Sequence, residues 1–352
     1  MSSIKETPET GGKFTRYKIN DGVRIICDDA FRGCEELIDV FIPASVNFIG
    51  DNAFSGCGKL KTINLPESVI YIGNGAFDCY EGHVTLPATL EIIDGNPFCQ
   101  RCKLSSNSLK YIVVNNVLFS SDMKRLISYC GTDSEYTIPQ GVEVVGKQAF
   151  RSSGLNRLYL NDMVTTIESG AFEDNEFQHL LLPPSTKRVS ESAFSNCNIG
   201  CLEFSSKVEF FENHDKYLSF APDYNIIKVP SGLLDYYKDL FSNNEVIDII
   251  DEDIIYEDGW FLNQDKTELI SSYGFDDDSD IAIPEGIVLV RNKSLYQIAM
   301  LSDVKIHFPK SINSITGDAL LNNSDLELYV PKGARGWYLS IFPELEDNII
   351  EE

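Results

Sequence analysis

The sequence is poor in histidine, in basic residues and in long apolar runs. Four histidines in 352 residues leave few of the side chains that most often bind metals or act as general bases. Lys and Arg number 29 against 54 Asp and Glu, so the net charge is −25. This balance argues against proteins that bind nucleic-acid phosphates or anionic lipids through bulk charge. No uncharged apolar run approaches the ~20 residues that span a bilayer, so we expect no nucleic-acid partner and no membrane insertion.

A secretory leader is also missing from the given sequence. Residues 1–20 are polar and contain no apolar core followed by a small-residue cleavage site. We therefore expect a cytoplasmic protein, or a secreted or cell-surface protein whose leader was removed.

What the sequence does contain is a repeat. It is 43% hydrophobic and 24% charged, which is too apolar for a disordered tail. Phenylalanines, most of them preceded by alanine, recur every 21 to 23 residues in two runs, Phe31, Phe54, Phe77 and Phe98, then Phe150, Phe172 and Phe194. A period between 20 and 30 residues is typical of a solenoid, in which one supersecondary unit stacks on the next.

One coil of about 22 residues can be interpreted from 60–77. Alternation predicts a short strand that ends at Pro66, which has no N–H for a sheet ladder. Gly73 permits a tight corner that a Cβ would obstruct. The inward side chains that we expect are Leu60, Ile63, Leu65, Val69, Ile72, Ala76 and Phe77. A single coil cannot bury this apolar face, so stacked coils must share the core.

Two kinds of segment interrupt the repeat. Residues 117–128 match 260–271, and each copy reads as a strand, a polar turn and a strand, which indicates an inserted hairpin. Residues 229–241 match 330–342 in the frame V-P-x-G-x3-[YW]-Y-x3-F. Each copy predicts a short closing helix over an open coil end. The apolar helix faces that we expect are Leu233, Leu234, Tyr237, Leu240 and Phe241 in the first copy, and Trp337, Tyr338, Ile341 and Phe342 in the second. Because the second copy ends with the chain, we expect Glu352 to be the natural C-terminus.

These segments predict a flexible N-terminus and two unequal modules. The N-terminal segment is 1–19. The first module is 20–250, with about nine coils, a hairpin at 115–130 and a closing helix at 229–242. The second module is 251–352, with a hairpin at 258–273, about three coils and a closing helix at 331–343.

The coil L-x-x-I-x-I-P-x-x-V-x-x-I-G-x-x-A-F-x-x-C resembles the BspA-like leucine-rich repeats of bacterial surface proteins. The repeats that carry the resemblance are 37–57, 60–77, 136–150, 155–172 and 177–197. It implies a β-rich leucine-rich-repeat solenoid with one short parallel strand per coil, two inserted hairpins and short capping helices. Members lie on the cell surface, some are linked to adhesion, and no catalytic residue or cofactor is implied. The second module departs most, since Leu295 and the pair Ala319-Leu320 stand where Ala-Phe is expected.

The motifs that suggest a phosphate, metal or redox site are explained more simply as parts of the repeat structure. Residues 141–148 approach a phosphate-binding loop, but Gln148 stands where that loop needs Ser or Thr. Cys99 and Cys102 form a C-x-x-C without a second pair, so buried free thiols are favoured over a local disulfide, a metal site or a redox pair. The aspartates of 276–280 lack the Gly and Glu of an EF-hand loop and are read as a solvated turn. We therefore expect no metal site.

The outward strand face is the surface on which we expect function. Its residues richest in aromatic, Arg and apolar character are Tyr111, Arg157, Tyr159, His179 and Leu181. We predict a non-enzymatic interaction or adhesion protein that binds a protein or glycan through this face, without catalytic residues or cofactors. An intracellular protein–protein scaffold is the alternative. A hydrolase that uses carboxylates of 245–285, where 14 acids accompany one base, is a further alternative.

Overall fold

The structure is a computed structural model. It describes residues 2–4, 14–98, 100–211, 226–241, 248–316, 318–320, 323 and 325–352. Of the predicted flexible N-terminus, 5–13 lie outside the described residues. Contacts divide the chain into unit 1 (Met1–Phe177, Leu181–Asn198 and Ser205–Ala221) and unit 2 (Gln178–Leu180, Ile199–Phe204 and Pro222–Glu352). The module boundary that we predict at residue 250 is a boundary between repeats, and it stays a prediction.

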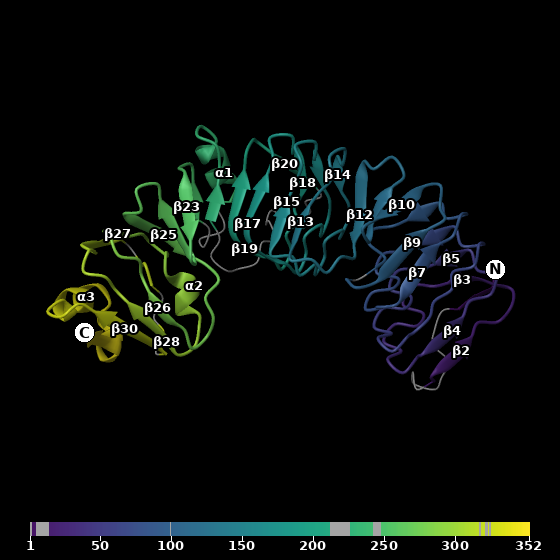
Figure 1. The fold of residues 1–352 in the computed structure, drawn as a ribbon, viewed down its shortest axis with the longest axis horizontal. Helices are drawn as coiled ribbons and strands as arrows, with labels where there is room; N and C mark the ends of the chain where they lie inside the picture. The colour runs from purple at the N-terminus through teal and green to yellow at the C-terminus, as the bar shows by residue number, and fades with distance from the viewer. Residues whose placement is uncertain are drawn as a thin grey trace. The chain divides into compact units, whose positions relative to one another are not determined.

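The predicted fold class is confirmed, because the chain forms a parallel β-solenoid of about 14 turns with few helices. Most regular coils have two short strands rather than the single one predicted, although the coil 60–77 has only β6 (Tyr71–Ile72) and an isolated bridge at Thr62. In unit 1 (Figure 1) the first strands pair as β2 (Arg16–Lys18) with β4 (Asp39–Phe41), β7 (His83–Leu86) with β9 (Lys103–Ser106), and β13 (Glu135–Thr137) with β15 (Arg157–Tyr159).

The second strands of unit 1 form two longer sheets. The five-stranded sheet has β1 (Ser2–Ile4), β3 (Val23–Ile26), β5 (Phe48–Ile49), β6 (Tyr71–Ile72) and β8 (Ile92–Ile93). The seven-stranded sheet has β10 (Tyr111–Val114), β11 (Val117–Ser120), β12 (Arg125–Tyr129), β14 (Val144–Val145), β16 (Thr166–Ile167), β18 (Arg188–Ser190) and β20 (Glu209–Phe211). The part of the coil that follows the proline, which returns the chain across the core, is therefore itself a strand.

Three further sheets lie largely in unit 2. One is β17 (Glu176–Leu182), β19 (Asn198–Phe204), β21 (Ile226–Lys228) and β22 (Asp248–Ile250). Another is β23 (Ile254–Glu257), β24 (Trp260–Asn263), β25 (Glu268–Ser272), β27 (Leu289–Val290) and β29 (Ser314–Ile315). The last is β26 (Asp280–Ala282), β28 (Val304–His307), β30 (Leu326–Val330) and β31 (Ile349–Glu351).

Stacked phenylalanines form the core of unit 1. Phe31, Phe54 and Phe77 are fully buried, with ring centroids 5.1 and 5.7 Å apart and rings nearly parallel. Such offset stacking of neighbouring rings is favourable beyond the apolar area that it buries. The same ladder runs from Phe150 through Phe172. The repeated phenylalanine is thus the element that joins each coil to the next.

The residue three places after each phenylalanine explains the recurring cysteine. The thiol of Cys57 donates a hydrogen bond to the Phe31 carbonyl of the preceding coil, at 3.2 Å. Cys197 donates in the same way to the Phe172 carbonyl, at 2.7 Å. The thiol therefore gives a buried carbonyl a second donor, since the Phe31 carbonyl also accepts the Cys34 N–H and the Phe172 carbonyl also accepts the Asn175 amide. The repeat cysteines Cys34, Cys57 and Cys197 therefore act structurally, as buried free thiols.

The predicted hairpins are present. β11 and β12 pair antiparallel, and β12 then pairs in parallel with β14, so the first hairpin continues the seven-stranded sheet. β24 and β25 repeat this arrangement in unit 2, where β25 pairs with β27. In each case a further antiparallel strand, β10 or β23, precedes the hairpin.

Short helices follow the two V-P-x-G segments, as predicted. They are α1 (Leu234–Leu240) and α3 (Arg335–Ile341), which bury Tyr237 and Tyr338. The prediction that Trp337 joins the buried face is wrong, since it is 37% exposed. Beyond α3, the 3₁₀ helix η1 (Pro343–Asn348) buries Leu345 instead.

The irregular coils of unit 2 keep the core positions but change the local structure. Leu295 and Leu320 are buried where phenylalanine is expected. The helix α2 (Tyr296–Ala299), which the sequence did not predict, follows Leu295 and buries Ile298. Apolar character at these positions is therefore enough to keep the stack, although the ring ladder is lost.

Candidate functional site

The first-strand face of β13 and β15 carries two of the predicted residues. Arg157 pairs in register with Glu135, and its Nη1 lies 3.0 Å from the Glu135 carboxylate. Tyr159 lies opposite Thr137 in the ladder and is 48% exposed. The guanidinium is thus partly neutralised, whereas the tyrosine ring is open to a partner.

Leu181 and His179 lie on β17. Leu181 is 43% exposed. His179 belongs to unit 2, where its Nε2 lies 3.1 Å from a Glu203 oxygen. Lys228 lies 3.2 Å from the other Glu203 oxygen. The hydrogen bond from His179, together with Lys228, lowers the pKa of Glu203 although partial burial opposes this. The repeat also predicts that the strand with Arg157 and Tyr159 lies next to the strand with His179 and Leu181. A ladder between β15 and β17 is not among the strand pairings of the described residues, so this adjacency stays a prediction.

The structure places Tyr111 elsewhere, which corrects its assignment to this face. It lies on β10, in the seven-stranded sheet of second strands. Its hydroxyl accepts a hydrogen bond from the Ile93 N–H at 2.9 Å and donates one to the Glu91 carbonyl at 3.2 Å. Tyr111 therefore provides hydrogen-bond partners for the backbone at the unpaired edge of β8, where the parallel ladder is interrupted. Burial raises the pKa of its hydroxyl.

A cavity of about 530 Å³ lies beside Tyr111 in unit 1. Its lining includes Asp122, Arg125, Lys147 and Glu168. Arg125 forms an ion pair with Glu168, and that same carboxylate accepts the Lys147 backbone N–H at 3.0 Å. The polar groups of this cavity therefore bind one another, and they join the hairpin to the coils that follow.

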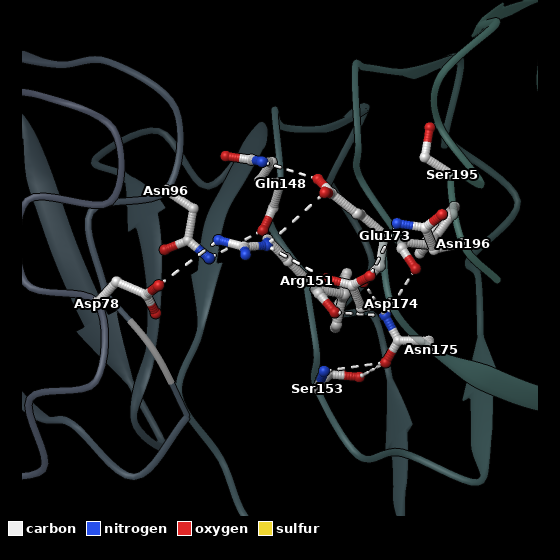
Figure 2. A network of polar contacts seen from close by, with 12 residues as sticks. Asp78, Asn96, Gln148, Arg151, Ser153, Glu173, Asp174, Asn175, Ser195 and Asn196 are labelled. Carbon is white, nitrogen blue, oxygen red and sulfur yellow. Dashed lines mark hydrogen bonds and ion pairs between the residues drawn. The ribbon is translucent and has the colours of Figure 1, made fainter. Parts of the chain in front are cut away.

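A second polar cluster joins coils that are far apart in sequence (Figure 2). The Asn96 amide donates to the Gln148 carbonyl at 2.8 Å, and the Gln148 amide donates to Glu173 at 2.8 Å. Arg151 reaches in both directions, lying 3.6 Å from Asp78 and 3.5 Å from Asp174. A cavity of about 440 Å³ adjoins this cluster. We interpret the cluster as a set of polar contacts that holds the coils before the hairpin against the coils after it.

Asn175 adjoins this cluster and stands three residues after Phe172, where other coils have the repeat cysteine. Its amide donates to the carbonyls of Phe150 and Phe172, both at 2.7 Å. Its oxygen accepts from the N–H and the hydroxyl of Ser153 (Figure 2). A buried amide with all of these partners stabilises the corner, which explains its position without any catalytic role.

The remaining candidates show no assembled catalytic or metal chemistry. Val142 and Val145 of the loop-like 141–148 segment are buried core residues. Cys99 and His214 lie outside the described residues. Within the part of the chain that the structure describes, no group of three His, Cys, Asp or Glu side chains is arranged to hold a metal. In the acidic segment 245–285, Glu252 and Glu268 both bind Arg291.

Cys201 and its surroundings correct another expectation. We expect its side chain to point outward, but it is buried within unit 2 against Ile226, Phe261, Ile270 and Tyr273. The second hairpin supplies the last three of these residues, so it covers the outer side of this sheet. Gly200 permits the approach, because a Cβ there would lie 2.8 Å from the Tyr273 ring.

One surface, formed by the second strands, is not among the sequence predictions. Ile25, Phe48, Tyr71 and Ile92 are paired in register across β3, β5, β6 and β8. We call these four residues the apolar stripe. Phe48 and Ile92 are 41% and 54% exposed. Apolar residues at the outward positions of the second strands indicate this surface, but the predicted binding face considers only the first strands.

Stacked parallel coils with a repeated apolar core define a leucine-rich-repeat protein. The BspA type leucine-rich repeat region matches at residues 9–125 and 109–217, in six copies. The chain belongs to this family, as the resemblance in its repeats predicts. No curated protein gives a significant match.

The chain is also similar to solved bacterial structures. The chain is similar to the pneumococcal vaccine antigen PcpA, with 18% identity, coverage of 99% of this chain and 83% of that one, and a TM-score of 0.50. It is also similar to a leucine-rich repeat protein from Eubacterium ventriosum, with 18% identity, 88% and 84% coverage and a TM-score of 0.49. A third, from Bacteroides ovatus, has 19% identity, 100% and 87% coverage and a TM-score of 0.43.

No helix in the described residues combines the length and the apolar character that crossing a bilayer requires.

Proposed function

We propose that this protein is a non-enzymatic recognition protein that binds a protein or glycan partner through the outer faces of its strands at the bacterial cell surface. The observation that carries the proposal is the exposed Tyr159 ring in a family of leucine-rich repeats, beside an arginine on the same strand. Aromatic and Arg side chains are the types that most often anchor interfaces. Family membership and a neighbour that is a vaccine antigen support a surface location.

The test is binding of the purified chain to a glycan array and to host and bacterial protein extracts. Each binding signal is then measured again with Arg157→Ala/Tyr159→Ala. Both side chains are about half exposed, so the double variant should fold normally. Lys124→Ala/Met163→Ala is the matched control, because it removes a basic and an apolar side chain of similar exposure elsewhere in unit 1.

The proposal predicts that the first double variant loses at least one specific partner that the control retains. If every detected interaction survives Arg157→Ala/Tyr159→Ala, this strand face is not the binding site. Leu181→Ala extends the same test to β17.

An intracellular scaffold of the same fold is the second candidate. The observation that favours it is that six described cysteines are free, namely Cys27, Cys34, Cys57, Cys79, Cys197 and Cys201. Free cysteines in this number are more usual in a reducing compartment. Fractionation of the native cells separates the two candidates, since protein recovered only from the cytosol contradicts the surface location.

A further inference from the structure

The apolar stripe lies on the outer face of the five-stranded sheet of unit 1, where Phe48 and Ile92 are exposed and Ile25 and Tyr71 are half-buried. Its four side chains occupy equivalent outward positions on neighbouring parallel strands, with Phe48 opposite Tyr71 and Tyr71 opposite Ile92. Adjacent strands lie ~4.8 Å apart, so the stripe presents one apolar group per coil over ~14 Å. The Phe48 and Tyr71 rings are in contact, with centroids 5.9 Å apart. The stripe therefore presents touching apolar groups rather than isolated ones.

A column of carboxylates follows one side of the stripe. Asp28 accepts the Asp51 backbone N–H at 2.9 Å, and Asp51 accepts the Asn74 N–H at 2.9 Å. Asp94 follows β8 directly, and the Tyr71 hydroxyl lies 3.4 Å from its carboxylate. Partial burial raises the pKa of Tyr71, and the charges of Asp94, Asp51 and Asp28 raise it further. All three carboxylates thus act on the centre of the stripe.

These charges are available to a partner. Among the ion pairs that the described residues of unit 1 form, none includes Asp28, Asp51 or Asp94. The opposite side of the stripe is mixed, with Arg24 at one end and Glu91 at the other, and Glu91 binds Lys110. A second copy of this chain would bring two acidic columns together, which like-charge repulsion disfavours.

The spacing of the stripe selects the shape of the partner. An α-helix presents one residue per turn every ~5.4 Å, so four turns match four coils to within ~2 Å over the whole length. An extended strand presents same-face residues every ~6.7 Å and is out of step by ~6 Å over the same distance. Flexible side chains can absorb the first mismatch but not the second.

We propose that the apolar stripe binds an amphipathic α-helix whose apolar residues recur at i, i+4, i+7 and i+11 and whose adjoining flank carries Lys or Arg. The apolar residues pack between Ile25, Phe48, Tyr71 and Ile92. The basic flank faces Asp28, Asp51 and Asp94. This surface is separate from the strand face that carries Tyr159, so the two can bind different partners.

The experiment uses the full chain and two synthetic helical peptides of about 18 residues. Both have leucines at the four apolar positions. One carries Lys along the flank and the other carries Glu there. Titration calorimetry at low salt should show the Lys peptide binding at least tenfold more tightly than the Glu peptide. Raising the salt to 1 M, where screening acts within ~3 Å, should reduce this preference to threefold or less.

Variants then locate the site. Phe48→Ala/Ile92→Ala should weaken binding of the Lys peptide by tenfold or more, because it removes the two most exposed anchors. Phe41→Ala is the matched control on the first strand of the same coil, since Phe41 is 54% exposed, and it should leave binding unchanged. Asp28→Asn/Asp94→Asn keeps the hydrogen-bond acceptors and should reduce the Lys preference about threefold.

Several results overturn the proposal. They are failure of the Lys peptide to bind at millimolar concentration, equal binding of both peptides, and binding that Phe48→Ala/Ile92→Ala leaves intact. Sedimentation of the free chain gives a further check. A dimer that this double variant abolishes would show that a second copy occupies the stripe instead.

Discussion

Replacing Gly73 by alanine should destabilise the solenoid, although such a change usually stabilises a protein by about 0.4–1 kcal/mol through the unfolded state. The stacking of coils is the reason. An added Cβ would lie 2.6 Å from the Asp51 backbone nitrogen and 2.7 Å from the Gly50 carbonyl carbon, both in the preceding coil. These are backbone atoms held by the parallel ladder, since the Gly73 N–H donates to the Ile49 carbonyl at 2.9 Å. They cannot move away as a flexible side chain would.

The magnitude follows from overpacking, which costs about 1–3 kcal/mol when surrounding backbone must shift. The matched control is Gly58→Ala, because a Cβ there meets nothing within 4 Å. We expect the control to be neutral or slightly stabilised. The free energies of unfolding of the two variants should therefore differ by about 2–3 kcal/mol.

Urea unfolding followed by circular dichroism measures this difference, with both variants and the wild type compared at equal concentration. The reasoning is wrong if Gly73→Ala unfolds at the same urea concentration as Gly58→Ala. That result would mean that the coils are not held as closely at this corner as the ladder indicates.

Three other measurements test the energetics of the coils. Phe54→Ala should lower the free energy of unfolding by about 3–5 kcal/mol, because it removes a fully buried ring from the ladder; urea unfolding checks this, and a loss below 1 kcal/mol would contradict it. Burial raises the pKa of Cys57 to about 12, so at pH 8 it stays a neutral thiol; alkylation followed by mass spectrometry should label the exposed Cys79 first, and equal rates would refute the packing. The folded-state pKa of Glu203 lies below its ordinary value of 4.5, so its contribution to stability is present above pH 4.5 and is lost as the pH falls through the lowered value. Unfolding curves should show that Glu203→Gln makes stability less dependent on pH in this acidic range, and an unchanged dependence would exclude the contacts of Glu203 with His179 and Lys228 as its cause.

Much of the fold can be predicted from the sequence because the repeat is local. The spacing of Phe54 and Phe77, the strand end at Pro66 and the corner at Gly73 each depend on a few neighbouring residues. Copies that agree along the chain make the solenoid the consistent solution. The two hairpins and the two closing helices follow in the same way, because each occurs twice.

The outward side chains could not be assigned in this way, because their role depends on contacts between coils. Whether Arg157 is free depends on Glu135, 22 residues earlier. Tyr111 looks like a surface residue until the interrupted ladder places the backbone of β8 beside its hydroxyl. Cys201 has the spacing of an outward residue, yet a hairpin more than 50 residues later covers it.

The sequence by itself therefore determined the coil, its core and its order along the chain, since these are set by short-range alternation and by period. Only the tertiary structure decided which outward groups are already bound and which are open. Gln148 contacts Asn74 across 74 residues because an inserted hairpin changes which coils are neighbours at that corner. The apolar stripe and its acidic column likewise exist as a surface only when the strands are placed in register. Each coil contributes at most one residue to the stripe and one to the column.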